Sequence, residues 1–365
     1  MSADPARAEI DARFCAWTRE PSWERDDARF GATALELFAF QFEHCAPYRR
    51  FCEGRGVRPD RIDDWRDVPP VPTGAFKELA LTSFPAQRAS HVFRTSGTST
   101  RERGELQLDT LAPYEASLLP TFQRFLLPDL APDRRARIVV LAPSRASAPD
   151  SSLSHMFDVA LRRLGDAESF FAVQDDVLDV QRVIDALRAY EPDGSPLLLC
   201  GTALAFVHLL DALEARQLAL DLPACARVME TGGFKGRART EPRDALYTRI
   251  EAQLGVPATR IVNQYGMTEL ASQFYDGSLA APARPRCKQG PPWARVRILD
   301  PRNAEPAEVG VIHVYDLANT GSLFAIQTAD LGRALPGGFE VLGREPGAEQ
   351  RGCSIAIDEL LGAAR

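Results

Sequence analysis

The sequence lacks the features that mark several large classes of protein. It contains no long run of lysine and arginine, and its formal net charge is -7, so a nucleic-acid partner is not expected. No apolar run approaches the ~20 residues that a membrane span requires. The first residues show no basic segment followed by an apolar one, so we expect no signal peptide and a cytoplasmic location.

Cysteine pairs with metal-binding or redox spacing are also missing. The seven cysteines are odd in number and include no Cys-x-x-Cys pair, which favours reduced thiols over a disulfide framework or a zinc site. They are Cys15, Cys45, Cys52, Cys200, Cys225, Cys287 and Cys353. Thiols therefore remain available for chemistry.

What is present is a composition typical of a soluble globular protein. The chain has 365 residues, of which 45% are hydrophobic and 25% are charged, which is enough for one large core or two. Apolar residues at helical spacing predict a helical region over 1–67. The proline-rich stretch 68–81 predicts an extended connector that ends in a short helix from Phe76 to Leu81.

From residue 91 onward, short apolar runs alternate with helical patterns, which predicts an α/β sheet protein. A helix over 175–190 is expected, with Asp175 or Asp176 as its N-cap and Val177 on its buried face. The period-two pattern of 310–317 predicts a half-exposed antiparallel strand that leaves His313 exposed. The other expected strands are 137–144, 196–203, 226–233, 260–266 and 294–300.

The segment FRTSGTSTRERGEL, residues 93–106, places five hydroxyl-bearing residues around Gly97, just after a short expected strand. One interpretation is a polar surface turn, because glycine, serine and threonine favour turns. The other is a loop whose hydroxyls and backbone N–H groups hold phosphate. Several other expected strands also end in glycine, serine, threonine or acidic residues, and ligands collect at the carboxyl ends of strands in open α/β sheets.

The most informative of these strand ends is NQYGMTELASQFYD, residues 263–276. Tyr265 offers a flat face for a purine, Thr268 a hydroxyl for a phosphate oxygen, and Glu269 a carboxylate suited to Mg²⁺. The alternative is a capped strand-to-helix turn, which the tetrad from Gly266 to Glu269 does not exclude by itself.

Four segments together resemble the signature of the adenylate-forming superfamily of acyl and aryl synthetases. They are TSGTS (95–99), TGGFK (231–235), NQYGMTE (263–269) and TADLGR (328–333). Their order and spacing agree with the superfamily over roughly residues 68–360. The resemblance implies an α/β fold of mixed sheets flanked by helices, with a helical N-terminal region and a truncated C-terminal domain.

Within that superfamily, the chain resembles the acyl-protein synthetases of the LuxE type. The segments PPVPTGAFKELAL, TGGFKG and LGREPGAEQRGCSIAIDEL carry this likeness. It implies activation of a carboxylic acid, here a fatty acid, as acyl-AMP, transfer of the acyl group to Cys353, and delivery to a partner such as a fatty acid reductase. Cys353 follows Arg351 and Gly352, where positive charge favours a thiolate, whereas a buried cysteine would act only as a small hydrophobic residue.

The resemblance also assigns a nucleotide site. The residues implied to bind ATP are Thr95, Ser96, Gly97, Thr98, Ser99, Gly232, Gly233, Phe234, Asn263, Tyr265, Gly266, Met267, Asp330 and Arg344. Glu269 would bind Mg²⁺ with Thr268 beside it, and these two residues with Cys353 form the implied catalytic set. For the acid, His155 and Met156 are candidate contacts, although a lone histidine is more often structural.

The sequence departs from the superfamily pattern in two places. The lysine expected after the phosphate loop is replaced within Thr100–Gly104, so Arg101 or Arg103 would substitute. The sequence ends about twenty residues after Arg344, so we expect no large mobile C-terminal domain and no coenzyme A binding. The expected division is a helical region 1–67, an adenylate-forming core 68–343 and a short segment 344–365 that carries Cys353.

Two rival functions stay open from the sequence. One is an amide- or ester-forming ligase that passes acyl-AMP to a separate amine, alcohol or carrier, which would release a free product and form no stable acyl-enzyme. The other is a nucleotide-binding module without catalysis, which would bind ATP but release no pyrophosphate with any carboxylic acid.

Overall fold

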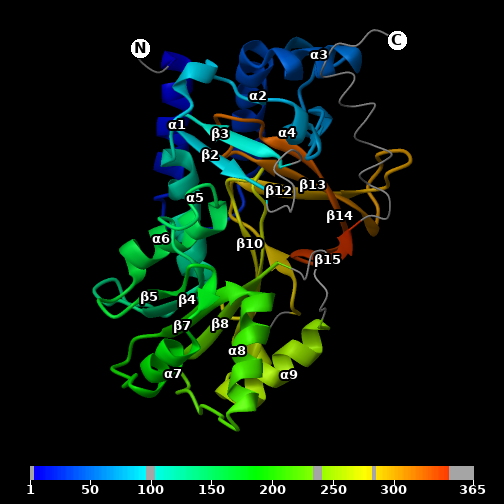
Figure 1. The fold of residues 1–365 in the computed structure, drawn as a ribbon. Helices are drawn as coiled ribbons and strands as arrows, with labels where there is room; N and C mark the ends of the chain where they lie inside the picture. Colours follow the sequence, from blue (N-terminus) through cyan, green and yellow to red (C-terminus); the bar gives the residue numbers. More distant parts are fainter. Residues whose placement is uncertain (1–3, 96–102, 233–240, 282–284, 345–365) are drawn as a thin grey trace. The chain divides into compact units, whose positions relative to one another are not determined.

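The computed structural model describes residues 4–95, 103–232, 241–281 and 285–344 (Figure 1). The chain forms two compact units, and it passes between them more than once. Unit 1 consists of Met1–Leu118, Met267–Gln273 and Gln289–Arg365, and unit 2 of Leu119–Gly266 and Phe274–Lys288. The predicted three-part division of the chain concerns function and stays a prediction.

Unit 1 begins with helices, as the apolar spacing predicts. Asp4 and Asp26 cap the first two, because each carboxylate accepts hydrogen bonds from N–H groups of the first turn that have no partner within the helix. The helices and short 3-10 turns are α1 (Pro5–Trp17), α2 (Asp27–His44), α3 (Ala46–Gly54), η1 (Pro59–Arg61), η2 (Trp65–Asp67), α4 (Ala75–Glu78) and η3 (Ala86–Arg88). The short helix expected at Phe76–Leu81 is therefore a single turn, α4.

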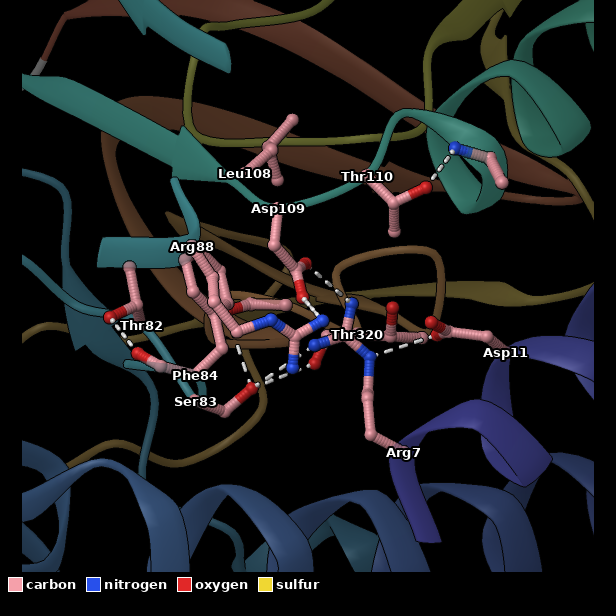
Figure 2. Close-up of polar contacts among 12 residues, drawn as sticks. Arg7, Asp11, Thr82, Ser83, Phe84, Arg88, Leu108, Asp109, Thr110 and Thr320 are labelled. Carbon is pink, nitrogen blue, oxygen red and sulfur yellow. Dashed lines mark hydrogen bonds and ion pairs between the residues drawn. The ribbon is translucent and has the colours of Figure 1, made fainter. Parts of the chain in front are cut away.

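A buried ionic cluster ties α1 to the rest of unit 1 (Figure 2). The Arg7 guanidinium lies 2.9 Å from Asp11 Oδ1 and 3.5 Å from Asp109 Oδ1, and it donates to Ser83 Oγ. Arg88 Nη2 approaches the other oxygen of Asp109 at 3.2 Å. The Arg7 and Asp109 side chains are only 5% and 6% exposed. The cost of burying each charge is therefore offset by the other charged and polar groups of the cluster.

Unit 1 contains an antiparallel sheet in the order β12 (Ala294–Leu299), β13 (Val309–Asp316), β14 (Ala325–Leu335), β15 (Gly338–Arg344). The two-residue β1 (Val71–Pro72) pairs in parallel with β14. A separate hairpin pairs β2 (His91–Arg94) with β3 (Glu105–Leu108).

The prediction that residues 310–317 form a half-exposed strand is wrong, because β13 is buried from Gly310 to Asp316. Aromatic side chains from the helices cover it: the ring centroids of Trp65 and Tyr315 are 4.8 Å apart, and Phe30 of α2 lies 5.0 Å from Trp65. His313 is consequently 7% exposed rather than on the surface. Period two shows which residues alternate between faces, but not whether another layer covers the polar face.

Unit 2 is built on a mostly parallel sheet, and the four strands predicted for it are confirmed. The order is β10 (Phe274–Asp276), β9 (Ile261–Tyr265), β8 (Ala226–Thr231), β7 (Leu197–Thr202), β4 (Arg137–Pro143), β5 (Phe170–Gln174), β6 (Val177–Leu178). The strands from β9 to β5 are parallel, and β10 and β6 pair antiparallel at the two ends. The two-residue β11 (Lys288–Gln289) lies at the boundary of the units.

The helices of unit 2 are α6 (Ser152–Leu164), α7 (Val180–Arg188), α8 (Ala203–Ala215) and α9 (Arg243–Leu254), with the 3-10 turn η4 (Ala258–Arg260), and α5 (Ala112–Leu126) enters from unit 1. Figure 1 shows α8 and α9 side by side, and both pack on the sheet. One core joins α7, α8 and α9 to alternate strand residues such as Val139, Leu197 and Val228. Burying each such side chain contributes about 1.5–3 kcal/mol.

The predicted start of the helix at 175–190 is wrong. Asp175 and Asp176 have φ angles of 50° and 60° and form the turn between β5 and β6. Helix α7 begins after Asp179, whose carboxylate accepts from the N–H of Arg182, and Val177 is 67% exposed. A two-residue hairpin turn requires positive φ angles, which aspartate tolerates better than most residues, so local turn geometry overrides the helical spacing.

Within the part of the chain that the structure describes, every helix is too short or too polar to cross a lipid bilayer.

Candidate active site

The two ends of the hydroxyl-rich segment are held together in unit 1. The Thr95 N–H donates to Gly104 O, and the Gly104 N–H donates back to Thr95 Oγ1, each at 2.9 Å. Arg103 Nε donates to Thr95 O at 2.7 Å. Of the two arginines proposed to replace the lysine, Arg103 therefore anchors the base of the loop, while Arg101 lies outside the described residues. The same is true of Ser96, Gly97, Thr98 and Ser99.

The Met267–Gln273 segment of unit 1 contacts the end of strand β2, just before that loop. Thr268 Oγ1 donates to Arg94 O at 3.4 Å, which places Thr268 against the last residue of β2, directly before Thr95. Glu269 is 7% exposed, and its main-chain carbonyl accepts from Asn319 Nδ2 at 2.8 Å. Met267, which is half-buried, closes the turn by accepting from the Leu270 N–H.

The alternative interpretation of the Gly266–Glu269 tetrad as a cap for a following helix is wrong. The residues after it turn and enter strand β10 at Phe274. Thr268 and Glu269 therefore do not cap a helix.

Asp330 and Arg344 are cross-strand partners on β14 and β15 of unit 1. Arg344 Nε lies 3.7 Å from Asp330 Oδ1, and their side chains are 56% and 18% exposed. An exposed pair at this distance contributes little to stability, at most about 1 kcal/mol. The predicted contact of Asp330 with a ribose stays a prediction.

In unit 2, Asn263 lies in β9 and is fixed by three side chains. Its Nδ2 donates to Glu230 Oε1 at 2.7 Å, its N–H donates to Asp276 Oδ2 at 3.2 Å, and its carbonyl accepts from Lys288 Nζ at 2.8 Å. Lys288 Nζ also lies 2.6 Å from Asp276 Oδ1, with both side chains 3% exposed.

Burial shifts the pKa values of these three ionisable groups. It raises the pKa of Glu230, and it lowers the pKa of Lys288 although Asp276 and Glu230 oppose that shift. For Asp276, burial acts to raise the pKa, but the charges and hydrogen bonds of Lys288 and Arg286 outweigh it and leave the pKa below its usual value. The network thus holds a buried Asp276–Lys288 ion pair at the strand that leads to Tyr265.

The carboxyl ends of β8 and β9 bring two of the quoted motifs, TGGFK and NQYGMTE, together. Thr231 pairs with Gln264 in the parallel register and donates a hydrogen bond to its side chain. Gly232 follows Thr231 with a φ of 75°, which favours glycine, and it is exposed. Tyr265 is half-buried next to Gln264, and Gly266 follows it. Gly233 and Phe234 lie outside the described residues.

His155 and Met156 lie near the start of α6, which Ser151 caps by accepting from the Ser154 N–H. Their exposures are 0% and 1%, and the Tyr275 hydroxyl donates to Met156 Sδ at 3.7 Å. Both side chains belong to the core of unit 2, and their contact with an acid stays a prediction.

The family model of acyl-protein synthetase, LuxE, matches residues 6–362 of this chain. The chain belongs to the LuxE acyl-protein synthetase family. It is thus an enzyme of the ligase class, as its motifs predict. As a LuxE-family chain, it is 22% identical over 374 residues to the long-chain-fatty-acid–luciferin-component ligase of Vibrio harveyi, with 98% of this chain and 95% of that protein covered. A ligase of the same name from Photorhabdus luminescens is 32% identical over 65 residues, or 18% of this chain and 55% of that protein.

Solved structures confirm the predicted fold class. An open conformation of 2-hydroxyisobutyryl-CoA ligase, in complex with 2-HIB-AMP and CoA, has a TM-score of 0.59 at 17% identity, covering 86% of this chain and 74% of that one. A long-chain-fatty-acid-CoA ligase from Archaeoglobus fulgidus has a TM-score of 0.50 at 13% identity, covering 71% and 52%. The LuxE-family chain therefore has the mixed α/β fold of adenylate-forming acyl-CoA ligases.

Cys353 lies outside the described residues of this LuxE-family chain, so its role stays a prediction. Among the described cysteines, Cys45 and Cys52 are buried, and burial raises the pKa of these thiols to about 11 and about 12. Cys200 is also fully buried, with its pKa raised by burial. These three thiols are poor nucleophiles near neutral pH, because the thiolate is the reactive form.

Sequence reasoning missed the buried polar residues that support the candidate site. Glu230 lies in the apolar run ARVMET, Asp316 ends the run GVIHVYD, and Lys288 follows Cys287 and begins strand β11. A single charged residue inside an apolar strand could have indicated them, because such a charge is buried and needs hydrogen-bond or ionic partners. Which partners it finds depends on segments far away in the chain.

Proposed function

We propose that this chain activates a long-chain fatty acid as acyl-AMP with release of pyrophosphate, accepts the acyl group on Cys353, and passes it to a partner protein such as a fatty acid reductase. Membership of an acyl-protein synthetase family supports transfer of an acyl group to protein. The name of the Vibrio harveyi relative supports a long-chain fatty acid as the substrate. We also propose a cytoplasmic location and assign residues 68–343 to the catalytic core and 344–365 to the acyl-carrying segment.

The observation that carries the proposal is the hydrogen bond from Thr268 to Arg94 O. It brings the Thr268–Glu269 pair to the start of the hydroxyl-rich segment, although these residues are far apart in sequence. Hydroxyls, backbone N–H groups and a carboxylate at one place are the groups that a magnesium–triphosphate requires.

In the first half-reaction, a carboxylate oxygen of the fatty acid attacks the α-phosphorus of ATP, and pyrophosphate leaves. Residues 95–99 would hold the β- and γ-phosphates, and Asp330 would accept hydrogen bonds from the ribose, with Arg344 beside it. Tyr265 would stack on the adenine, next to the backbone from Gly232 to Phe234. The chain's main contribution is to position the reactants.

In the second half-reaction, the Cys353 thiolate attacks the carbonyl carbon of acyl-AMP, a thioester bond forms, and AMP leaves with the electron pair of the broken C–O bond. Thiolates are effective nucleophiles near neutral pH. The thioester then passes to a thiol or another acceptor on the partner.

The residues present fit Mg²⁺. Glu269 supplies a hard carboxylate oxygen and Thr268 a hydroxyl, while the described residues contain no group of three or more histidine, cysteine or acidic side chains that could form a complete metal cage. Mg²⁺ is commonly held by one or two carboxylates together with substrate phosphates and waters. When bound, the ion would neutralise charge on the phosphate oxygens.

The first test is carboxylate-dependent exchange of pyrophosphate into ATP, measured over a panel of acids of different chain length. We expect exchange with long-chain fatty acids, and at least a 100-fold loss in Glu269→Gln, because the amide keeps the shape but loses the charge. Glu308→Gln, a change on an exposed residue, is the matched control and should retain full exchange. Binding of ATP without exchange for any acid would instead support the non-catalytic nucleotide-binding module.

The second test is the intact mass of the protein after incubation with ATP and the active acid. We expect the wild type to gain one acyl group, and Cys353→Ser to gain none while it keeps its pyrophosphate exchange. Cys225→Ser is the matched control. An unchanged acyl-protein in Cys353→Ser would exclude this cysteine, and a free amide or ester product without acyl-protein would support the alternative ligase.

A further inference from the structure

A buried carboxylate in unit 1 contacts the segment that carries Thr268 and Glu269. Asp316, the last residue of β13, is 0% exposed. Its Oδ2 accepts from the N–H groups of Ala271 and Ser272 at 2.9 and 2.6 Å. Its Oδ1 accepts from Ser272 Oγ at 2.6 Å and from the Ala318 N–H at 3.1 Å.

Three of these four hydrogen bonds cross to a segment that lies more than forty residues earlier in the chain. If Asp316 only stabilised the turn that follows it, the hydrogen bond from the Ala318 N–H would be sufficient. Burial raises the pKa of Asp316, and the hydrogen bonds from Ser272, Ala318 and Ala271 oppose that shift. Burial of this acid therefore has a cost, and three of the four hydrogen bonds that offset it come from the segment of Glu269.

A second support holds the middle of the same segment. Asn319, three residues after Asp316, donates from Nδ2 to the Glu269 carbonyl at 2.8 Å. The Asn319 carbonyl in turn accepts from Gln41 Nε2 at 2.8 Å, and Gln41 Oε1 accepts from the Phe324 N–H at 3.1 Å. Gln41 of helix α2 thus binds Asn319, and Asn319 binds the backbone of Glu269.

The far end of the segment is fixed through Ser272. Its hydroxyl shares a hydrogen bond of 2.8 Å with Ser117 Oγ, which also accepts from Trp293 Nε1 at 2.7 Å. Ser117, Ser272 and Trp293 are all buried. The backbone is therefore held at Glu269 itself and again two and three residues later.

We propose that Asp316 is a positioning residue: it fixes the backbone of Met267–Gln273 so that the Glu269 carboxylate and the Thr268 hydroxyl face a bound magnesium–phosphate group. This inference rests on the proposed function. Asp316 touches neither substrate nor metal, and it acts through Ala271 and Ser272.

The decisive variant is Asp316→Asn. An asparagine keeps the size of the side chain, but its NH₂ group must face one of the N–H or O–H donors that Asp316 accepts from, whichever way the amide turns. The matched control is Asp109→Asn, which makes the same change to another buried carboxylate of unit 1. Asp109 contacts Arg7 and Arg88 at the end of β3 away from the 95–104 connection (Figure 2).

The readouts are the Kd for ATP by calorimetry at fixed Mg²⁺, the KM for ATP and kcat in pyrophosphate exchange, the Mg²⁺ concentration that gives half-maximal exchange, and the melting temperature. For Asp316→Asn we expect the Kd, the KM and the Mg²⁺ requirement to rise at least ten-fold. For Asp109→Asn we expect a lower melting temperature with all three values within two-fold of the wild type. If Asp316 had only a structural role, Asp316→Asn would likewise lower the melting temperature and leave the three values within two-fold of the wild type.

Ser272→Ala keeps the test decisive if Asp316→Asn does not fold. It removes only the hydroxyl that donates to Oδ1, so the same three values should rise about three-fold, and values within experimental error of the wild type would overturn the inference. If the wild type shows no exchange, the proposed function fails and the inference fails with it. If the wild type is active and Asp316→Asn behaves like Asp109→Asn, only the inference fails.

Discussion

At the scale of single residues, the candidate site depends on charges that are buried beside it. Lys288 lies between Asp276 and the Asn263 carbonyl, and it gives the strand before Tyr265 a fixed position. Its pKa is lowered by burial, yet it is paired with a carboxylate at 2.6 Å. Such a pair adds little stability over an apolar pair, but loss of one partner leaves the other charge buried with less compensation.

We therefore expect Lys288→Met to lower the free energy of unfolding by about 3–5 kcal/mol. The methionine fills a similar volume, but it leaves Asp276 with a single cationic partner and the Asn263 carbonyl without its donor. Urea unfolding followed by circular dichroism measures the change. Arg286→Met is the control: Arg286 also contacts Asp276 but is 27% exposed, so its loss should cost less than half as much. Equal losses in the two variants would contradict this account.

At the scale of elements, the parallel strands of unit 2 could be predicted and the helix boundary at 175–190 could not. Apolar runs such as RIVVLAP and PLLLCGT have one interpretation once helices lie between them, because a strand covered on both faces is apolar throughout. The segment around Asp175 has two interpretations, a helix cap or a turn between strands, since VLDVQRVIDAL carries helical spacing from Val177 onward. The pairing of β6 with β5 settles it, and pairing is a contact that spacing does not encode.

Asp176 and Asp179 therefore have opposite expected effects. Asp179→Ala removes the N-cap of α7 and should destabilise unit 2 by about 1 kcal/mol. Asp176→Gly relieves a φ of 60° and should be neutral or stabilising by up to about 1 kcal/mol, because glycine adopts positive φ freely. Chemical denaturation of the two variants decides between the structure and the sequence interpretation. A destabilised Asp176→Gly together with a neutral Asp179→Ala would restore Asp176 as the helix cap.

At the scale of the whole molecule, each compact unit is built from segments that are far apart in the sequence. The N-terminal helices and the strands from Ala294 to Arg344 share unit 1, where Gln41 bonds to Asn319 across 278 residues. All four tryptophans, Trp17, Trp23, Trp65 and Trp293, lie in this unit, so their fluorescence reports its unfolding. We also expect the stability of this unit to depend on pH, because it contains the buried His313.

Burial, with the charge of Arg297 opposite, lowers the pKa of His313 from 6.5 to about 4. The unfolded chain then binds a proton between pH 6.5 and pH 4 that the folded chain does not, so stability is complete above pH 6.5 and falls as the pH drops toward 4. The expected loss from this residue is about 3 kcal/mol. Tryptophan-monitored urea unfolding from pH 7 to pH 4.5 should show a steeper loss in the wild type than in His313→Gln. Parallel curves for the two proteins would show that His313 is protonated in the folded state.

The sequence by itself determined the parallel strands of unit 2 and the family to which the chain belongs. Apolar runs and four short motifs are local patterns, and they sufficed to predict the parallel strands and the family and to propose the residues that bind ATP. Tertiary structure alone decided that β13 is covered and that Thr268 meets the end of β2. It also decided that Asp316 and Asn319 bind the segment of Glu269 and that Gln41 binds Asn319. The physical reason is that a buried polar group must find its hydrogen-bond partners in space, and those partners lie tens to hundreds of residues away along the chain.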